Sequence, residues 1–224
     1  MSFQTINEML LKGFGTTCLL FILTLVLSLP LGLIIMFGIK SPFKPIKYVC
    51  NVFVWIIRGT PLMLQLFVVF FVPSLVFKVQ LFSFSTGTIF DGRFLAALIT
   101  FVINYACYFS VIFKGGVDNV SRGQYEAGKV LGLTKTQIFF KIVLLQVIKA
   151  ILSPISNEVI TLVKDTSLAR VISVAEIFFI NETKILSRAI VWPLFYIGVF
   201  FLLFVGLLTI TFNFLEKKLS YFKV

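Results

Sequence analysis

Long runs of apolar residues alternate with short polar segments along the 224-residue chain. Five runs are as long as the about 20 residues that an α-helix needs to cross a bilayer. They lie at residues 15–37, 52–77, 94–113, 142–163 and 189–214. Arg58-Gly59-Thr60-Pro61 interrupts the second run. Thr60 suits the N-cap and Pro61 the first position of a helix, so the spanning part begins at Pro61 or Arg58 lies inside a longer, kinked helix. The pattern predicts one all-α integral membrane domain of five spanning helices over residues 1–224.

Composition excludes the common soluble classes. Hydrophobic residues make up 59% of the chain and charged residues 13%, with a mean hydropathy of +1.06. A soluble domain has about 45–50% apolar and about 25% charged residues. Histidine is absent, and Cys18, Cys50 and Cys107 are far apart in the sequence. We therefore predict no metal cluster and no histidine base.

The basic residues indicate an orientation in the membrane. The net charge is +11, and lysine and arginine are concentrated in residues 38–50, in residues 114–149 and in the C-terminal tail. In a five-helix arrangement these three segments lie on one side, which the positive-inside rule identifies as the cytoplasm. The N-terminus is then outside and the C-terminus cytoplasmic, with external loops at about 78–93 and 165–188. We attribute the positive charge to membrane orientation and not to nucleic-acid binding.

The cytoplasmic loop, residues 114–141, is predicted to form two short helices. Ser121 with Gln124, and Thr134 with Gln137, have the spacing of a capping box, and Gly132 between them suits a left-handed helix end. Ala127, Val130 and Leu131 form an apolar face on the first helix. Such a helix docks into a cytoplasmic partner or lies on the membrane surface, and these two alternatives stay open on the residues alone.

The same loop carries a resemblance. Glu126-Ala127-Gly128-Lys129-Val130-Leu131-Gly132-Leu133, with the apolar stretch that follows, resembles the EAA loop of bacterial ABC importer permeases. Further motifs resemble the subfamily that imports polar amino acids such as histidine, glutamine, arginine and cystine. They are Arg58-Gly59-Thr60-Pro61, Asn104 with Tyr108, Lys114-Gly115, Asn157-Glu158, Lys164-Asp165-Thr166-Ser167-Leu168 and Val174-Ala175-Glu176.

The resemblance implies a type I ABC importer fold in the bacterial cytoplasmic membrane, and it implies partners. Glu126, Ala127, Gly128, Leu131 and Gly132 would contact separate ATPase subunits, which bind ATP and magnesium. A second permease chain, identical or related, and an extracytoplasmic substrate-binding protein would complete the transporter. The chain has no G-x-x-x-x-G-K-[ST] sequence, so we expect it to be a non-catalytic subunit without a bound cofactor.

Polar residues inside the apolar runs are the candidates for a substrate pathway. They are Asn104, Tyr108, Asn157, Glu158, Thr161, Lys164, Asp165, Thr166 and Ser167. Lys164, Thr166 and Ser167 offer donors for a carboxylate, and the acidic side chains offer acceptors for an ammonium group. The alternatives are hydrogen bonds that join helices and a Lys164–Asp165 network that closes an external gate. Val111 stands where the family usually has glutamate, which leaves one carboxylate fewer for a cationic substrate.

Two function classes follow. The first is the permease subunit of an ATP-driven importer for a polar amino acid or a close analogue, working by alternating access. The second is a small ion-coupled secondary transporter or channel with Glu158 as the ion or proton site. The EAA-like loop and the lack of a visible internal repeat favour the first.

Overall fold

The computed structural model describes residues 2–85 and 87–219, and it contains no strand among them. Four helical stretches are long and apolar enough to cross a membrane: Phe3–Ile39, Gly92–Asp118, Lys135–Ile172 and Pro193–Leu219. A bent helix pair raises the number of possible spans to five. The expected all-α membrane fold is confirmed, with four or five candidate spans.

The elements have the following bounds. They are α1 (Phe3–Ile39), α2 (Lys44–Gly59), α3 (Leu62–Leu75), α4 (Gly92–Asp118), α5 (Arg122–Val130), α6 (Lys135–Ile138), the π-helical η1 (Phe139–Val143), α7 (Leu144–Asp165), the 3₁₀-helical η2 (Thr166–Ile172), α8 (Ile177–Ile180), the π-helical η3 (Asn181–Ile185), the 3₁₀-helical η4 (Leu186–Arg188) and α9 (Pro193–Leu219). The predicted external loop at 165–188 is therefore largely helical.

Helix α1 begins twelve residues before the predicted start at residue 15. Ser2 caps it by accepting a hydrogen bond from the Thr5 N–H at 3.2 Å. The added turns carry polar residues, which is why the apolar run did not include them. They still bury Ile6 and Leu10 against Ile177 of α8.

The second predicted helix is two helices, α2 and α3, bent by 105° at Thr60-Pro61. Pro61 and not Thr60 is the N-cap of α3, so the N-cap predicted for Thr60 is wrong. The Thr60 hydroxyl instead donates to the Ile56 carbonyl of the preceding helix at 2.9 Å. The Gln65 amide bridges the corner by donating to Ile57 O at 2.7 Å and to Thr60 Oγ1 at 2.9 Å.

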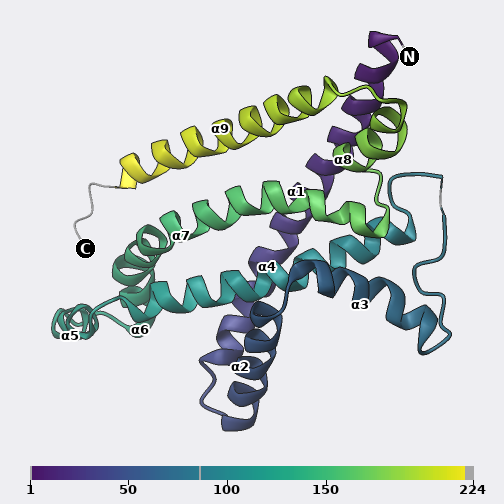
Figure 1. Ribbon diagram of the computed structural model, residues 1–224. Coiled ribbons are helices and arrows are strands. Elements are labelled where there is room, and N and C mark those ends of the chain that lie inside the picture. Colours follow the sequence, from purple (N-terminus) through teal and green to yellow (C-terminus); the bar gives the residue numbers. More distant parts are fainter. Residues whose placement is uncertain (1, 86, 220–224) are drawn as a thin grey trace.

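Helices α4 and α7 lie side by side at the centre, and α1 crosses them at a steep angle (Figure 1). Helix α3 runs along α4, while α2 returns beside the end of α1 (Figure 1). The short helices α5 and α6 are at one end of the molecule and α8 is at the other. Lys40, after α1, reaches Asp118 at the end of α4 at 2.7 Å, and Lys114 binds the same carboxylate at 2.8 Å. The lysine-rich segments after α1 and α4 therefore meet at the α5 end.

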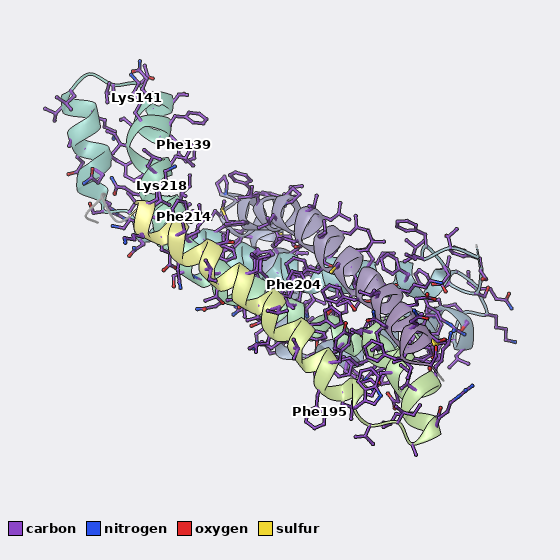
Figure 2. The ribbon with its side chains drawn as sticks, turned by 90° about the horizontal axis from the view of Figure 1, so that it is seen from above. Phe139, Lys141, Phe195, Phe204, Phe214 and Lys218 are labelled. Carbon is purple, nitrogen blue, oxygen red and sulfur yellow. The ribbon has the colours of Figure 1, made fainter. Side chains whose placement is uncertain are left out.

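Helix α9 covers one side of the bundle, and much of its surface is open (Figure 2). Phe204, in its middle, packs edge-on against Phe21 of α1, with ring centroids 5.0 Å apart. Phe195 and Phe214, toward its two ends, are 77% and 66% exposed. An all-apolar exposed face is expected for a helix that contacts lipid.

The crossing of α1 and α4 requires a glycine. A Cβ on Gly32 would lie 2.9 Å from Phe109 Cβ and 3.0 Å from the Ala106 carbonyl oxygen of α4. Moving the α4 backbone away from such a Cβ would disturb its packing. We therefore expect Gly32→Ala to destabilise the protein by about 1–3 kcal/mol. Gly15 on the same helix has nothing within 4 Å of such a Cβ, so Gly15→Ala is the matched control and should be neutral or slightly stabilising. Thermal unfolding in detergent measures both, and equal midpoints would contradict the predicted packing.

Candidate functional site

A cavity of about 390 Å³ lies between the α2–α3 corner, α4 and the end of α7. Its lining contains two carboxylates, Glu158 and Asp165, and no basic side chain among the described residues. The remaining lining residues are Thr60, Pro61, Leu62, Asn104, Tyr105, Tyr108, Thr161 and Leu168. The cavity is therefore acidic, with hydroxyl and amide groups around the two carboxylates.

Hydrogen bonds hold two of the polar groups in place. The Tyr105 hydroxyl donates to Asp165 Oδ2 at 2.7 Å and so joins α4 to α7. The Asn104 amide donates to Gln65 Oε1 at 3.0 Å and so joins α4 to the α2–α3 corner. Fixed side chains of this kind keep their positions when a ligand enters, which lowers the entropic cost of binding.

Five of the nine predicted pathway residues line this cavity: Asn104, Tyr108, Glu158, Thr161 and Asp165. Asn157 and Lys164 are exposed and do not line it. Thr166 and Ser167 donate their hydroxyl hydrogens to Val163 O and Lys164 O in their own helical segment. The predicted donor group of Lys164, Thr166 and Ser167 is therefore not assembled around the cavity.

The predicted Lys164–Asp165 network also differs from the structure. Asp165 accepts from Tyr105, and the described part of the chain shows no ion pair between Asp165 and Lys164. Consecutive residues on a helix point about 100° apart, so a side chain that faces α4 leaves its neighbour facing elsewhere. Asp165 faces the bundle and Lys164 is exposed.

Tyr105 and Leu62 belong to the cavity but were not among the sequence candidates. Tyr105 lies one residue from Asn104, which was a sequence candidate. Only the hydrogen bond to Asp165 identifies Tyr105 as part of the cavity, and that bond joins residues sixty positions apart. Val111, the position where the family usually has glutamate, lines another cavity.

Arg58 lies at the edge of this region. Its guanidinium carbon is 5.0 Å from the centroid of the Tyr108 ring. Because a charge at bilayer depth is costly, an arginine in an apolar run is expected to be paired or to extend to the membrane interface. The Arg58 guanidinium stacks on an aromatic ring, which favours a cation electrostatically without neutralising it. Within residues 2–85 and 87–219, Arg58 forms no ion pair.

The arrangement is suited to binding a polar solute. Carboxylates with tyrosine and asparagine around them accept hydrogen bonds from an ammonium group. In the described part of the chain, no three histidine, cysteine or acidic residues are grouped as metal ligands.

The α5–α6 hairpin presents a second candidate site. Gly132 has φ +74° and ends the turn as expected, and Thr134 forms the predicted capping box with Gln137. Ser121 makes no side-chain cap, because the Gln124 N–H bonds to the Ser121 carbonyl. That predicted capping box is therefore wrong.

One face of α5 is packed and the other is open. Gly128 is buried against Ile138 of α6, and an added Cβ would lie 2.7 Å from Ile138 Cγ1. Glu126 and Ala127 are exposed, and Val130 and Leu131 are 88% and 75% exposed. Exposed aliphatic side chains beside a carboxylate are typical of a surface that a partner covers.

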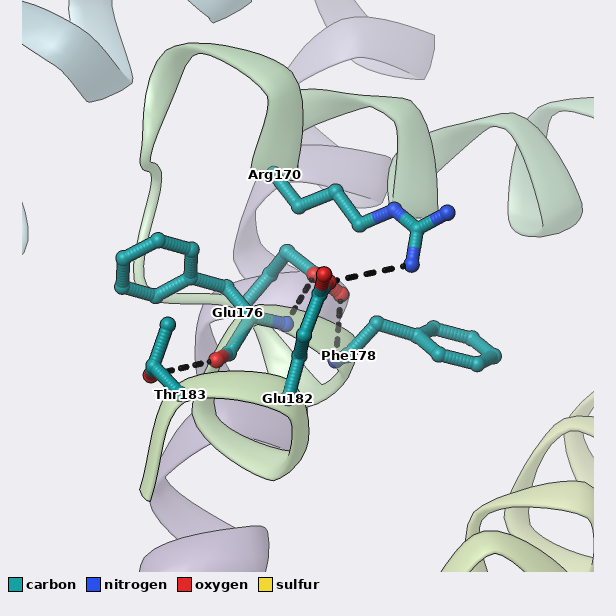
Figure 3. Close-up of polar contacts among 6 residues, drawn as sticks. Arg170, Glu176, Phe178, Glu182 and Thr183 are labelled. Atoms are coloured by element: carbon teal, nitrogen blue, oxygen red, sulfur yellow. Dashed lines mark hydrogen bonds and ion pairs between the residues drawn. The ribbon is translucent and has the colours of Figure 1, made fainter. Parts of the chain in front are cut away.

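Glu176 is fully buried in the connection between the α7 and α9 spans. This connection lies at the α8 end of the molecule, opposite α5 (Figure 1), and Figure 3 shows the polar contacts there. It caps α8 by accepting from the Phe178 N–H at 2.9 Å and the Phe179 N–H at 2.7 Å. Above it Arg170 pairs with Glu182 at 3.3 Å. Burial raises the pKa of the Glu176 carboxyl to about 7, although the two N–H groups and Arg170 favour its ionised form.

The raised pKa predicts a pH dependence of stability. The native protein binds the Glu176 proton more tightly than the unfolded chain does, so this contribution to stability is complete below about pH 4.5 and is lost as the pH rises through about 7. We expect the difference in unfolding midpoint between wild type and Glu176→Gln to change between pH 5.5 and pH 8, with wild type losing more. Thermal unfolding in detergent at the two pH values measures it, and parallel shifts in both proteins would contradict it.

A family model described as binding-protein-dependent transport system inner membrane component matches residues 28–221. Among curated proteins, the L-cystine transport system permease protein TcyB of Bacillus subtilis is 36% identical over 176 residues, covering 78% of this chain and 70% of that protein. The probable glutamine ABC transporter permease protein GlnM of Bacillus subtilis is 29% identical over 215 residues, covering 95% of this chain and 94% of that protein.

Solved structures show the same fold. A chain from a crystal structure of an amino acid ABC transporter with histidines matches 97% of this chain over 99% of its own length, with a TM-score of 0.80 and 24% identity. A chain from an inward-facing structure of the MetNI methionine ABC transporter matches 98% of this chain over 100% of its length, with a TM-score of 0.73 and 15% identity. The expected type I importer architecture is confirmed at the level of the fold.

Proposed function

This chain belongs to the family of binding-protein-dependent transport system inner membrane components, and on that premise we propose that it is the permease subunit of an ATP-driven importer for polar amino acids. The observation that supports this most strongly is the cavity between α4 and α7, where Glu158 and Asp165 meet in the wall of a membrane-spanning bundle. Charged side chains are costly inside a bilayer and are retained where they line a solute path. Family membership disfavours the ion-coupled alternative.

The substrate class follows from the chemistry of the cavity and from the names of the relatives. Every α-amino acid carries an ammonium group, and Glu158 and Asp165 supply acceptors for it. Relatives are named for cystine, glutamine and arginine. The volume of about 390 Å³ is within the usual range for small-molecule sites.

The coupling site is the open face of α5. Glu126, Ala127 and Leu131 contact the ATPase, while Gly128 and Gly132 shape the hairpin that presents them. Gly128 lets α5 lie against Ile138, and Gly132 takes the left-handed conformation at the turn. Because α6 continues through η1 into α7, a displacement of the hairpin moves the helix that carries Glu158 and Asp165.

The assembly contains two permease chains, two ATPase subunits that bind ATP and magnesium, and an extracytoplasmic binding protein. The α5 end faces the cytoplasm, so the N-terminus is outside and the C-terminus inside, in agreement with the lysine clusters. ATP binding brings the ATPases together, the two α5 hairpins follow, and the cavity changes the side to which it opens.

Purification in mild detergent from the native membrane tests this assembly. We expect an ATPase with a Walker A sequence to co-purify, together with a second permease band if the partner chain is a different one. A chain that elutes alone, with uptake indifferent to ATP, would overturn the proposed function.

A further inference from the structure

A second cavity, of about 460 Å³, lies about one turn farther along α4 in the direction of α5. Its lining includes two basic side chains, Arg58 and Lys114, and no carboxylate among the described residues. The other lining residues are Ile39, Asn51, Val54, Trp55, Gly59 and Val111. The first cavity is acidic and the second is basic, so the charge along this face of α4 changes sign between them.

The boundary between the two cavities is the contact of Arg58 with Tyr108. Tyr108 lines the acidic cavity and Arg58 lines the basic one, and the guanidinium carbon is 5.0 Å from the ring centroid. Glu158 is near enough to attract Arg58 electrostatically, yet the two form no ion pair among the described residues. The planar face of Arg58 is therefore held by a ring, while its N–H donors have no carboxylate partner.

Lys114, the other cation of the basic cavity, is already engaged. Its ammonium group binds Asp118 at 2.8 Å, and Asp118 also binds Lys40. Among the described residues, Arg58 is therefore the cation of the basic cavity that is available to bind an incoming anion. A guanidinium group recognises a carboxylate through two parallel hydrogen bonds, which a point-charge ammonium group cannot reproduce.

An α-amino acid carries both of the charges that the two cavities complement. We propose that Arg58 binds the α-carboxylate of the transported amino acid at the boundary of the two cavities, while Glu158 and Asp165 bind its ammonium group. The carboxylate replaces the Tyr108 ring as the partner of Arg58, and this exchange opens the path from the acidic to the basic cavity. The inference rests on the proposed import of amino acids, and it gives Arg58 the role that the sequence suggested for Lys164.

The test uses the complete transporter, with its ATPase and binding protein, in liposomes, and labelled L-cystine, L-glutamine and L-arginine as probes. We expect Arg58→Gln to lower the maximal uptake rate about 30-fold or more. KM should stay within about twofold, because the binding protein captures the substrate before the pathway does. Arg58→Lys keeps the charge and loses the two parallel hydrogen bonds of the guanidinium group. Its maximal uptake rate should therefore lie between those of wild type and Arg58→Gln.

Arg93→Gln is the matched control, since Arg93 is an exposed arginine on α4 that lines neither cavity. If the wild type imports a probe and Arg58→Gln imports it at the same rate, the proposed role of Arg58 is overturned. The proposed function is then unaffected. A wild type that imports none of the three overturns the proposed function itself, and the inference with it. If Arg58→Gln does not assemble with the ATPase, Arg58→Lys is the variant that tests the inference. An unchanged maximal uptake rate in Arg58→Lys overturns it.

Discussion

ATP-driven uptake should fall about 100-fold or more when Glu126 is replaced by arginine, with the permease still folded and in the membrane. Glu126 is exposed on α5, next to the exposed apolar face formed by Val130 and Leu131. Reversing a charge at a covered interface removes one attraction and adds a repulsion, which together cost several kcal/mol. The measurement is uptake in reconstituted vesicles, alongside ATPase activity and detergent elution of the variant.

The control for that variant places an arginine on the other side of the same helix. Gln124 is exposed and two residues from Glu126, so its side chain points about 160° away around α5. Gln124→Arg should keep most of the uptake. Wild-type uptake in Glu126→Arg would remove α5 as the coupling site and leave the surface-helix interpretation of this segment.

The second large effect is expected at Glu158. This carboxylate lines the acidic cavity and forms no ion pair among the described residues. If it binds the substrate ammonium, Glu158→Gln leaves that charge without a partner at a partly desolvated site, a loss of about 3 kcal/mol or about 100-fold in rate. Glu158→Asp keeps the charge on a shorter side chain and should recover part of the rate. Uptake of labelled amino acid measures both.

Asn157→Ala separates the pathway role from a packing role. Asn157 precedes Glu158 but is exposed and outside the cavity, so this variant should import at nearly the wild-type rate. If Glu158 only joined helices through hydrogen bonds, glutamine would preserve those bonds. Full uptake in Glu158→Gln would therefore assign Glu158 to helix packing.

The sequence predicted the features that depend on local patterns. Runs of apolar residues located the spans, because each crossing must satisfy its backbone within one helix. Gly132 and the Thr134 capping box were recognisable because their roles depend on residues within one turn. The start of α1 was missed because its first turns are polar and are stabilised by packing on α8.

The cavity was predictable only in part, because it is formed by contacts between distant segments. The apolar periodicity of residues 142–163 does not show which side of α7 meets α4. The sequence therefore suggested a network of Asp165 with Lys164, whereas in the structure Asp165 accepts a hydrogen bond from Tyr105. The α2–α3 corner was visible as Thr60-Pro61, but the 105° bend and the bridging role of Gln65 were not. Both depend on the backbone direction after the break, which no local residue pattern specifies.

Energy coupling is the central claim, and reconstituted vesicles test it most directly. The complete transporter is placed in liposomes with its binding protein, ATP is supplied on the side of α5, and labelled glutamine uptake is followed with the proton gradient collapsed by an ionophore. The account predicts uptake that requires hydrolysable ATP and continues without the gradient. Uptake that stops with the gradient and is indifferent to ATP would contradict it, and Glu158 would then be the first residue to test as an ion site.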